Sequence, residues 1–115
     1  EVMMNNLEER VYIAKLFDLY GKMLTQKQQE LFFLYYYEDL SLSEISIQEA
    51  ITRQGIHDHL RRAEEKLKLL EEELGFAKRL DNIENALLGL IEQATSYEEI
   101  KTGVKELLEE VTYGL

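Results

Sequence analysis

The chain has 115 residues, of which 31% are charged and 45% hydrophobic, with no Pro, no Cys and a formal net charge of −10. Its length suits one domain, or a small domain with an appendage, and the many Leu, Glu and Lys predict an all-α fold. The lack of Cys excludes disulfides, thiolate metal sites and a cysteine nucleophile. No apolar run approaches the roughly 20 residues that cross a bilayer. We therefore expect a cytoplasmic protein without membrane insertion.

Two helices are predicted in the first third of the chain. Apolar residues recur every three or four positions over residues 7–20, which predicts a helix with one buried stripe. Gly21 can end this helix in a left-handed cap. Thr25 and Gln28 form a capping box that begins a second helix, reaching about Tyr37. The stripe of the first helix comprises Leu7, Val11, Ala14, Phe17 and Tyr20, widened by Ile13 and Leu16.

Residues 39–62 predict a short helix, a turn and a second helix. Ser41 and Glu44 form another capping box at the start of the first helix, and Thr52 is placed to cap the second. Arg and Gln near a helix N-terminus can contact guanine and adenine edges in a major groove, and later Arg residues would meet phosphates. The alternative is an ordinary charged surface helix. The candidate nucleic-acid-binding residues are Thr52, Arg53, Gln54, His57, Arg61 and Arg62.

The charge distribution qualifies this interpretation. A net charge of −10 opposes the binding of a polyanion by the surface as a whole. However, residues 51–62 carry three Arg and two His against one Asp, whereas residues 64–73 carry five Glu against two Lys. A basic face on an acidic body predicts weak, salt-sensitive binding, and a protein partner is an equal alternative.

The second half of the chain predicts one long helix followed by a helical hairpin. From Ile56 to Leu74, apolar residues alternate at spacings of four and three, which gives a heptad-like seam. Gly75 ends this helix, a second covers residues 77–94, and a Ser96–Glu99 capping box begins the last. The seam must be covered by the hairpin or by a second chain, and we expect a homodimer. The predicted dimer seam comprises Leu67, Leu70, Leu74, Leu80, Ile83 and Leu87.

We expect a helix-turn-helix domain over residues 1–62 and a helical extension with the dimerisation region over residues 63–115. No catalytic residue, cofactor or metal is predicted. The two histidines, His57 and His59, lie roughly 200° apart around a helix and cannot share a metal ion. The chain is therefore interpreted as a non-enzyme.

Four segments carry a family resemblance: residues 16–20 (LFDLY), 24–28 (LTQKQ), 35–45 (YYYEDLSLSEI) and 52–62 (TRQGIHDHLRR). In order and spacing they resemble the YlxM family, small bacterial helix-turn-helix proteins similar to region 4 of sigma factors. The resemblance implies a dimer and a role linked to the signal recognition particle, beside whose GTPase members are typically encoded. The expected fold is an all-α, sigma-region-4-like helix-turn-helix bundle with a long fourth helix and a C-terminal helical hairpin.

The chain departs from the family pattern at the turn. Such turns usually carry Gly or Asn where this chain has Ala50, which is strained in left-handed backbone. Ser46 replaces a small Ala, Glu49 replaces an apolar residue, and Ile47 occupies a normally polar position. Either the turn is rebuilt with a slipped first helix, or the motif has become a packing unit.

Three functions are left open. The favoured one is an accessory or regulatory protein of the signal recognition particle pathway that contacts the particle's RNA or its GTPase. The second is a dimeric transcriptional regulator that binds duplex DNA. The third is a protein-interaction module that binds no nucleic acid.

Overall fold

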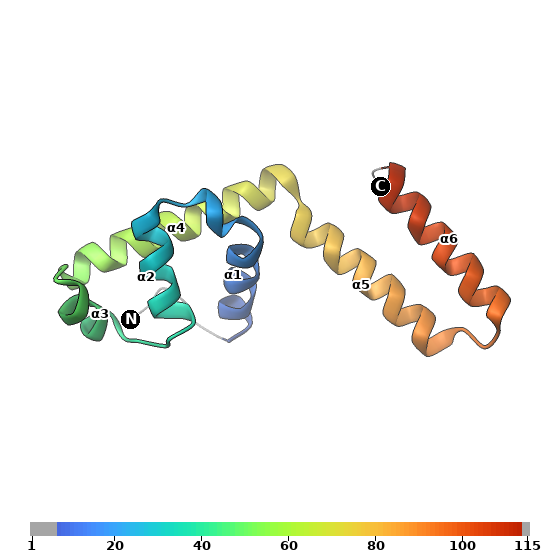
Figure 1. Cartoon of the computed structure of the whole chain (residues 1–115), viewed down its shortest axis with the longest axis horizontal. Helices are drawn as coiled ribbons and strands as arrows, with labels where there is room; N and C mark the ends of the chain where they lie inside the picture. Colours follow the sequence, from blue (N-terminus) through green and yellow to red (C-terminus); the bar gives the residue numbers. More distant parts are fainter. Residues whose placement is uncertain (1–6, 114–115) are drawn as a thin grey trace. The chain divides into compact units, whose positions relative to one another are not determined.

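The computed structural model describes residues 7–113, which form six α-helices and one short 3-10 helix. This confirms the all-α prediction. Contacts divide the chain into two compact units, of which unit 1 ends at Gly75 and unit 2 begins at Phe76. The elements are α1 (Leu7–Tyr20), η1 (Gly21–Met23), α2 (Gln26–Tyr36), α3 (Leu42–Glu49), α4 (Arg53–Leu74), α5 (Phe76–Gln93) and α6 (Tyr97–Tyr113), shown in Figure 1.

The long helix α4 organises unit 1, because α1, α2 and α3 all pack against it. Ile56, Leu60, Ala63 and Leu67 are each 0% exposed and form its buried face. The first half of the heptad-like seam is thus covered by the three preceding helices. Leu67, which was predicted as part of the dimer seam, is instead buried in the core of unit 1. The expected domain boundary after residue 62 falls inside α4, which runs unbroken to Leu74.

The first helix has the predicted limits, and its buried residues Ile13, Leu16 and Tyr20 all belong to the predicted stripe. Ile13 and Leu16 are fully buried, whereas Leu7 and Val11 are 74% and 59% exposed. The predicted stripe through Leu7 and Val11 is therefore wrong at these two positions. At the end of the buried face, the Tyr20 hydroxyl donates a 2.6 Å hydrogen bond to the Glu71 carboxylate of α4.

Gly21 does not form the predicted left-handed cap. The chain continues from α1 directly into η1, and Gly75 is the glycine with positive φ among the described residues. Gly21 is buried, and a Cβ added there would lie 3.0 Å from the Phe17 ring. A glycine is needed here because the backbone passes close to an aromatic side chain.

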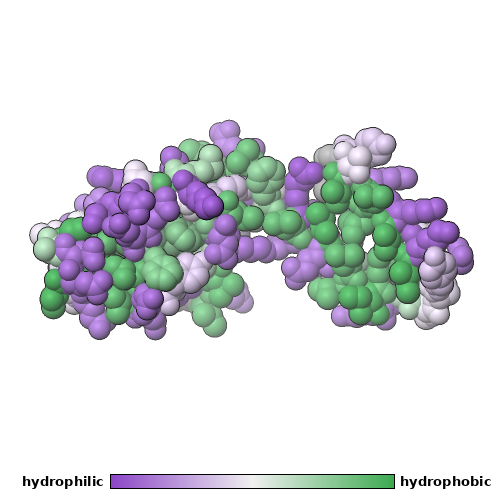
Figure 2. All heavy atoms as spheres, viewed as in Figure 1, coloured by the Kyte–Doolittle hydropathy of each residue, from purple (hydrophilic) through white to green (hydrophobic). Residues whose placement is uncertain are grey.

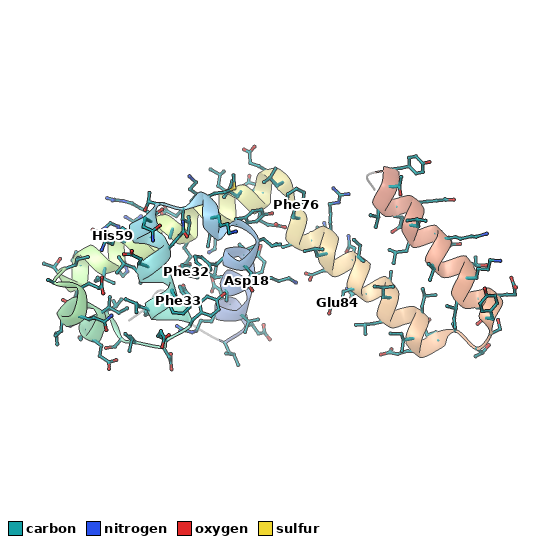
Figure 3. All side chains as sticks on the ribbon, in the orientation of Figure 1. Asp18, Phe32, Phe33, His59, Phe76 and Glu84 are labelled. Carbon is teal, nitrogen blue, oxygen red and sulfur yellow. The ribbon has the colours of Figure 1, made fainter. Side chains whose placement is uncertain are left out.

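The aromatic residues of α2 join this helix to α1. Phe32 is fully buried and stacks on Phe17, with ring centroids 4.3 Å apart, and on Tyr36 at 4.1 Å. Figure 3 shows Phe32 directed into unit 1, whereas the neighbouring Phe33 is 47% exposed. The aromatic run is thus only partly buried, because α2 has one face toward α1 and α4 and another toward solvent.

One carboxylate lies inside unit 1. Glu64 of α4 is only 7% exposed and accepts a 3.1 Å hydrogen bond from the Tyr36 hydroxyl. The ammonium group of Lys68 lies 3.7 Å from its other oxygen. Burial raises the pKa of Glu64, which the Tyr36 hydrogen bond and Lys68 partly offset. Burial and the adjacent Glu64 also raise the pKa of Tyr36. This contact joins α2 to α4.

Unit 2 is an antiparallel hairpin of α5 and α6 (Figure 1). At its turn, Ser96 accepts from the Glu99 amide, and the Glu99 carboxylate accepts from the Thr95 amide instead of the expected Ser96 amide. Gly103 faces α5, where an added Cβ would overlap the Leu90 side chain. The glycine therefore lets the two helices approach closely at this point.

Candidate nucleic-acid interface

The turn between α3 and α4 keeps its left-handed residue although that residue is alanine. Ala50 has φ 54° and ψ 42°, and it ends α3 as expected for a helix-turn-helix. The Ser46 hydroxyl donates a 2.5 Å hydrogen bond to the Ile51 carbonyl, which ties the last turn of α3 to the loop. Residues 50–52 separate the two helices.

The short helix α3 is held by its cap and two buried residues. Both hydrogen bonds of the predicted Ser41–Glu44 capping box are present, and Ile45 is fully buried. The departures from the family pattern lie outside this core. Ile47 is 84% exposed, and the Glu49 carboxylate lies 3.7 Å from the Lys27 ammonium group of α2. An ion pair to α2 thus takes the place of an apolar contact.

The N-terminus of α4 is capped as predicted. The Thr52 hydroxyl accepts a 3.0 Å hydrogen bond from the Gly55 amide. An added Cβ at Gly55 would lie 2.9 Å from the Ile51 side chain, so the first turn of α4 is closely packed on the preceding loop. The direction in which α4 leaves the turn is therefore fixed by local contacts.

The structure brings the six candidate nucleic-acid-binding residues to one end of α4. All lie on its first three turns or at its cap, outside the buried face formed by Ile56 and Leu60. Arg53, His57 and Arg61 follow one another at intervals of four residues and so share one side of the helix. The exposed residues of the set are Thr52, Arg53, Gln54, Arg61 and Arg62, and His57 is half-buried.

Two of these side chains are already held by acidic neighbours. The Gln54 amide donates a 2.9 Å hydrogen bond to Asp58, and the Arg61 guanidinium donates one of 2.9 Å to Glu65. Neither pair was predicted, although a spacing of four residues on a helix is a recognised signal for such pairs. A nucleic acid would have to exchange these contacts for its own, which lowers the net gain from each side chain.

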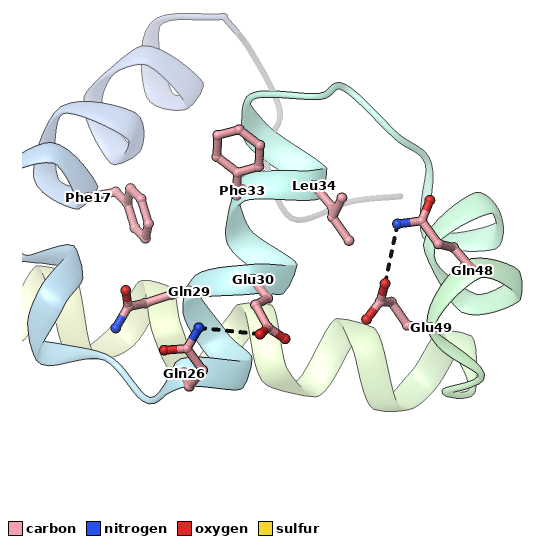
Figure 4. Close-up of a pocket in the computed structure, with 8 residues that line it drawn as sticks. All are labelled: Phe17, Gln26, Gln29, Glu30, Phe33, Leu34, Gln48 and Glu49. Carbon is pink, nitrogen blue, oxygen red and sulfur yellow. Dashed lines mark hydrogen bonds between the residues drawn. The ribbon is translucent and has the colours of Figure 1, made fainter.

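A separate groove lies on the other helices of unit 1. It has a volume of about 620 Å³, and none of its lining residues belongs to α4 (Figure 4). The Gln26 and Gln48 amides donate hydrogen bonds of 3.3 Å to Glu30 and Glu49 respectively. This arrangement contains no paired nucleophile and base. The lining residues are Phe17, Gln26, Gln29, Glu30, Phe33, Leu34, Gln48 and Glu49.

Residues 7–113 contain neither a cluster of metal-ligating side chains nor a bilayer-spanning helix. No group of three or more His, Asp or Glu residues in this part of the chain is arranged to hold a metal ion. None of its helices combines the length and apolarity that a membrane span requires.

A family model described as "Putative helix-turn-helix protein, YlxM / p13 like" matches residues 7–109. The chain belongs to this family, which is also named UPF0122. A UPF0122 protein of Thermoanaerobacter sp. (strain X514) is 46% identical over 80 residues, which cover 70% of this chain and 68% of the relative. One of Clostridium perfringens (strain 13 / Type A) is 37% identical over 109 residues, which cover 91% and 97%. One of Listeria monocytogenes is 38% identical over 96 residues, which cover 84% and 87%.

The family match covers residues of both units. The YlxM match extends beyond the helix-turn-helix into α6, so the hairpin is part of the family pattern. The family description names a helix-turn-helix protein and no enzymatic activity. A helix-turn-helix commonly serves nucleic-acid binding, and the exposed end of α4 is the corresponding surface.

Proposed function

We propose that this protein is a non-enzymatic regulatory protein that binds nucleic acid through the first turns of α4. This function is supported by the exposed cationic and amide side chains on the first turns of α4. This helix is capped by Thr52 and follows a turn with the left-handed Ala50. Arg53 and Gln54 occupy the first turn, where base edges are contacted, and Arg61 and Arg62 lie two turns later, suited to phosphates.

The cellular setting we propose is the signal recognition particle pathway, in the cytoplasm. It follows from the resemblance of the chain to YlxM proteins, which implies a partner in the particle's RNA or its GTPase. The acidic body of the protein opposes tight binding of any polyanion, duplex DNA and RNA alike, and this favours the particle's GTPase as the contact in this setting.

The geometry of the turn favours a second candidate function, regulation of transcription through duplex DNA. The major groove of B-form DNA admits a helix, and a helix-turn-helix inserts the N-terminus of its second helix there. The major groove of A-form RNA is too narrow for this. Binding to RNA would therefore use phosphates and unpaired bases, whereas binding to DNA would use Arg53 and Gln54 to read base edges.

The deciding experiment is a titration of the purified chain against labelled signal-recognition-particle RNA and against random duplex DNA over a range of salt concentrations. Preference for the RNA supports the first candidate. Preference for duplex DNA, with an affinity that falls steeply with salt, supports the second. If neither is bound, the nucleic-acid proposal is wrong, and the particle's GTPase is the partner to test.

Two variants with opposite expected effects test the surface itself. Replacing Arg53 and Gln54 by Ala should weaken specific binding by about 1–3 kcal/mol for each lost base contact. Asp58→Asn should strengthen binding, because it removes a negative charge and weakens the hold on Gln54. Lys101→Ala, an exposed change on α6, is the matched control. Unchanged binding by both α4 variants would contradict the proposal.

A further inference from the structure

The groove on α1, α2 and α3 continues into a second hollow along α1 and η1. Phe17 and Gln29 line both hollows, so the two adjoin at these residues. Their volumes are about 620 Å³ and 480 Å³. Together they form an elongated depression on unit 1. A stretch of extended polypeptide fits this shape better than a compact small molecule does.

The first hollow combines apolar side chains with carboxylates. Phe33 and Leu34 follow Glu30 by three and four positions on α2, so all three lie on one side of this helix. Phe33 is 47% exposed, and Glu49 at the end of α3 completes the lining. This mixture differs from the surface of the hairpin, where Figure 2 shows hydrophobic side chains gathered over α5 and α6.

The two carboxylates of this hollow already hold one cation together. The Lys27 ammonium group lies 3.5 Å from Oε2 of Glu30 and 3.7 Å from Oε1 of Glu49. The other oxygen of each carboxylate accepts a hydrogen bond from a glutamine amide, of Gln26 and Gln48 respectively (Figure 4). The amides thus orient the carboxylates so that one oxygen of each is directed to a shared cation.

We propose that this groove binds a segment of a partner protein through an arginine side chain. A guanidinium has five donors in a planar fork and can bond both Glu30 and Glu49, whereas an ammonium group acts as a point charge. Its flat face can also stack on the exposed ring of Phe33. Apolar residues beside the arginine would cover Leu34 and Phe17.

The charge of the groove selects against other partners. Among the described residues that line the first hollow none is cationic, so phosphates and acidic peptides are repelled. None of the six candidate nucleic-acid-binding residues lines either hollow. The groove is therefore a second surface, separate from the end of α4. Failure of either proposal leaves the other standing.

Lys27 competes with the incoming arginine. Its side chain is 44% exposed, and exposed ion pairs are weak, so the exchange is easy. Lys27→Gln should therefore tighten binding of an arginine peptide about twofold to fivefold. A variant that binds more tightly cannot owe its effect to a loss of folding.

A nuclear magnetic resonance titration of the ¹⁵N-labelled full chain tests this proposal. The probe is the peptide acetyl-Gly-Leu-Arg-Leu-Gly-amide, and the matched peptide carries citrulline, a neutral isostere, in place of arginine. We expect saturable shifts of the side-chain amides of Gln26 and Gln48. Glu49→Gln should raise the dissociation constant about fivefold. Glu73→Gln, the same change at an exposed site of α4, is the matched control.

A wild-type chain whose groove amides do not shift would overturn the proposal. Equal binding of the citrulline peptide would show that the carboxylates recognise no cation, and would also overturn it. An equal effect of Glu49→Gln and Glu73→Gln would reduce the binding to general attraction by an acidic protein. Phe33→Leu keeps an apolar side chain but removes the ring, and it should weaken the arginine peptide more than the citrulline peptide.

Discussion

Ala50 has a left-handed backbone conformation at a position where glycine would be unstrained. For an L-residue this conformation costs about 1–2 kcal/mol, and it is found here because the ends of two helices fix the turn. The Ser46 hydroxyl, bonded to the Ile51 carbonyl, contributes one of these local constraints. Ala50, which departs from the family pattern, is therefore strained in its backbone, but it still ends α3 in the left-handed conformation.

We expect Ala50→Gly to raise the free energy of unfolding by up to about 1 kcal/mol. The relief of strain is partly offset by the greater conformational entropy of glycine in the unfolded chain. Urea unfolding followed by circular dichroism measures the change. Ala50→Val should lower stability, since a β-branched residue fits this conformation poorly. A glycine variant less stable than the wild type would show that the turn is not strained.

Glu64 makes stability depend on pH. Burial raises its pKa in the folded state above the ordinary value of 4.5, so the folded protein retains a proton that the unfolded chain has lost. Stability should therefore fall as pH rises from about 4.5 through the raised pKa. This pH dependence arises because burial disfavours the charged form of the Glu64 carboxylate.

Glu64→Gln should remove this pH dependence while keeping an acceptor for the Tyr36 hydroxyl. Relative to the wild type, the glutamine variant should gain stability as pH rises from 4.5, and the difference should disappear in acid. Unfolding measured at several pH values provides the comparison. Tyr36→Phe should move the transition to higher pH, because the hydrogen bond from Tyr36 lowers the pKa of Glu64. Parallel pH profiles for wild type and Glu64→Gln would contradict this account.

At the scale of elements, the two glycines of the hairpin have different roles. Gly89 of α5 has no atom within 4 Å of an added Cβ, whereas Gly103 of α6 faces the Leu90 side chain. Both lower the intrinsic stability of their helices, by about 1 kcal/mol relative to Ala. Only at Gly103 does close packing, against the Leu90 side chain, explain why a glycine is present despite this loss of stability.

Gly89→Ala should therefore stabilise unit 2 by about 1 kcal/mol. Gly103→Ala should fail to gain this amount, or should destabilise the hairpin, because Leu90 has to move. Thermal unfolding of the two full-length variants under identical conditions gives the comparison. If both variants gain stability equally, α5 and α6 do not need close approach at Gly103.

At the scale of the whole molecule, the two units present different surfaces. Unit 1 has exposed cationic side chains at one end of α4, and unit 2 has exposed aliphatic side chains such as Ile91 and Leu108. A single α4 face on a chain with net charge −10 should bind nucleic acid weakly.

The sequence by itself determined where the helices of unit 1 begin. The caps at Thr25, Ser41 and Thr52 are all formed as expected, because each depends on hydrogen bonds between residues three apart. Gly75 likewise ends α4 in left-handed backbone. The exposure of the polar face of α4 also followed from its period, since the opposite face is strongly apolar.

Only the tertiary structure decided which apolar surfaces meet. A helical period defines a face but not its partner, so it could not show that Leu67 is buried in unit 1 or that Leu7 is exposed. The same limit applies to Gly21 and Gly103, whose roles depend on Phe17 and Leu90. Several faces of a helix can have the same apolar spacing in the sequence. Tertiary packing decides which of them is buried, because burial depends on the element that lies opposite each face.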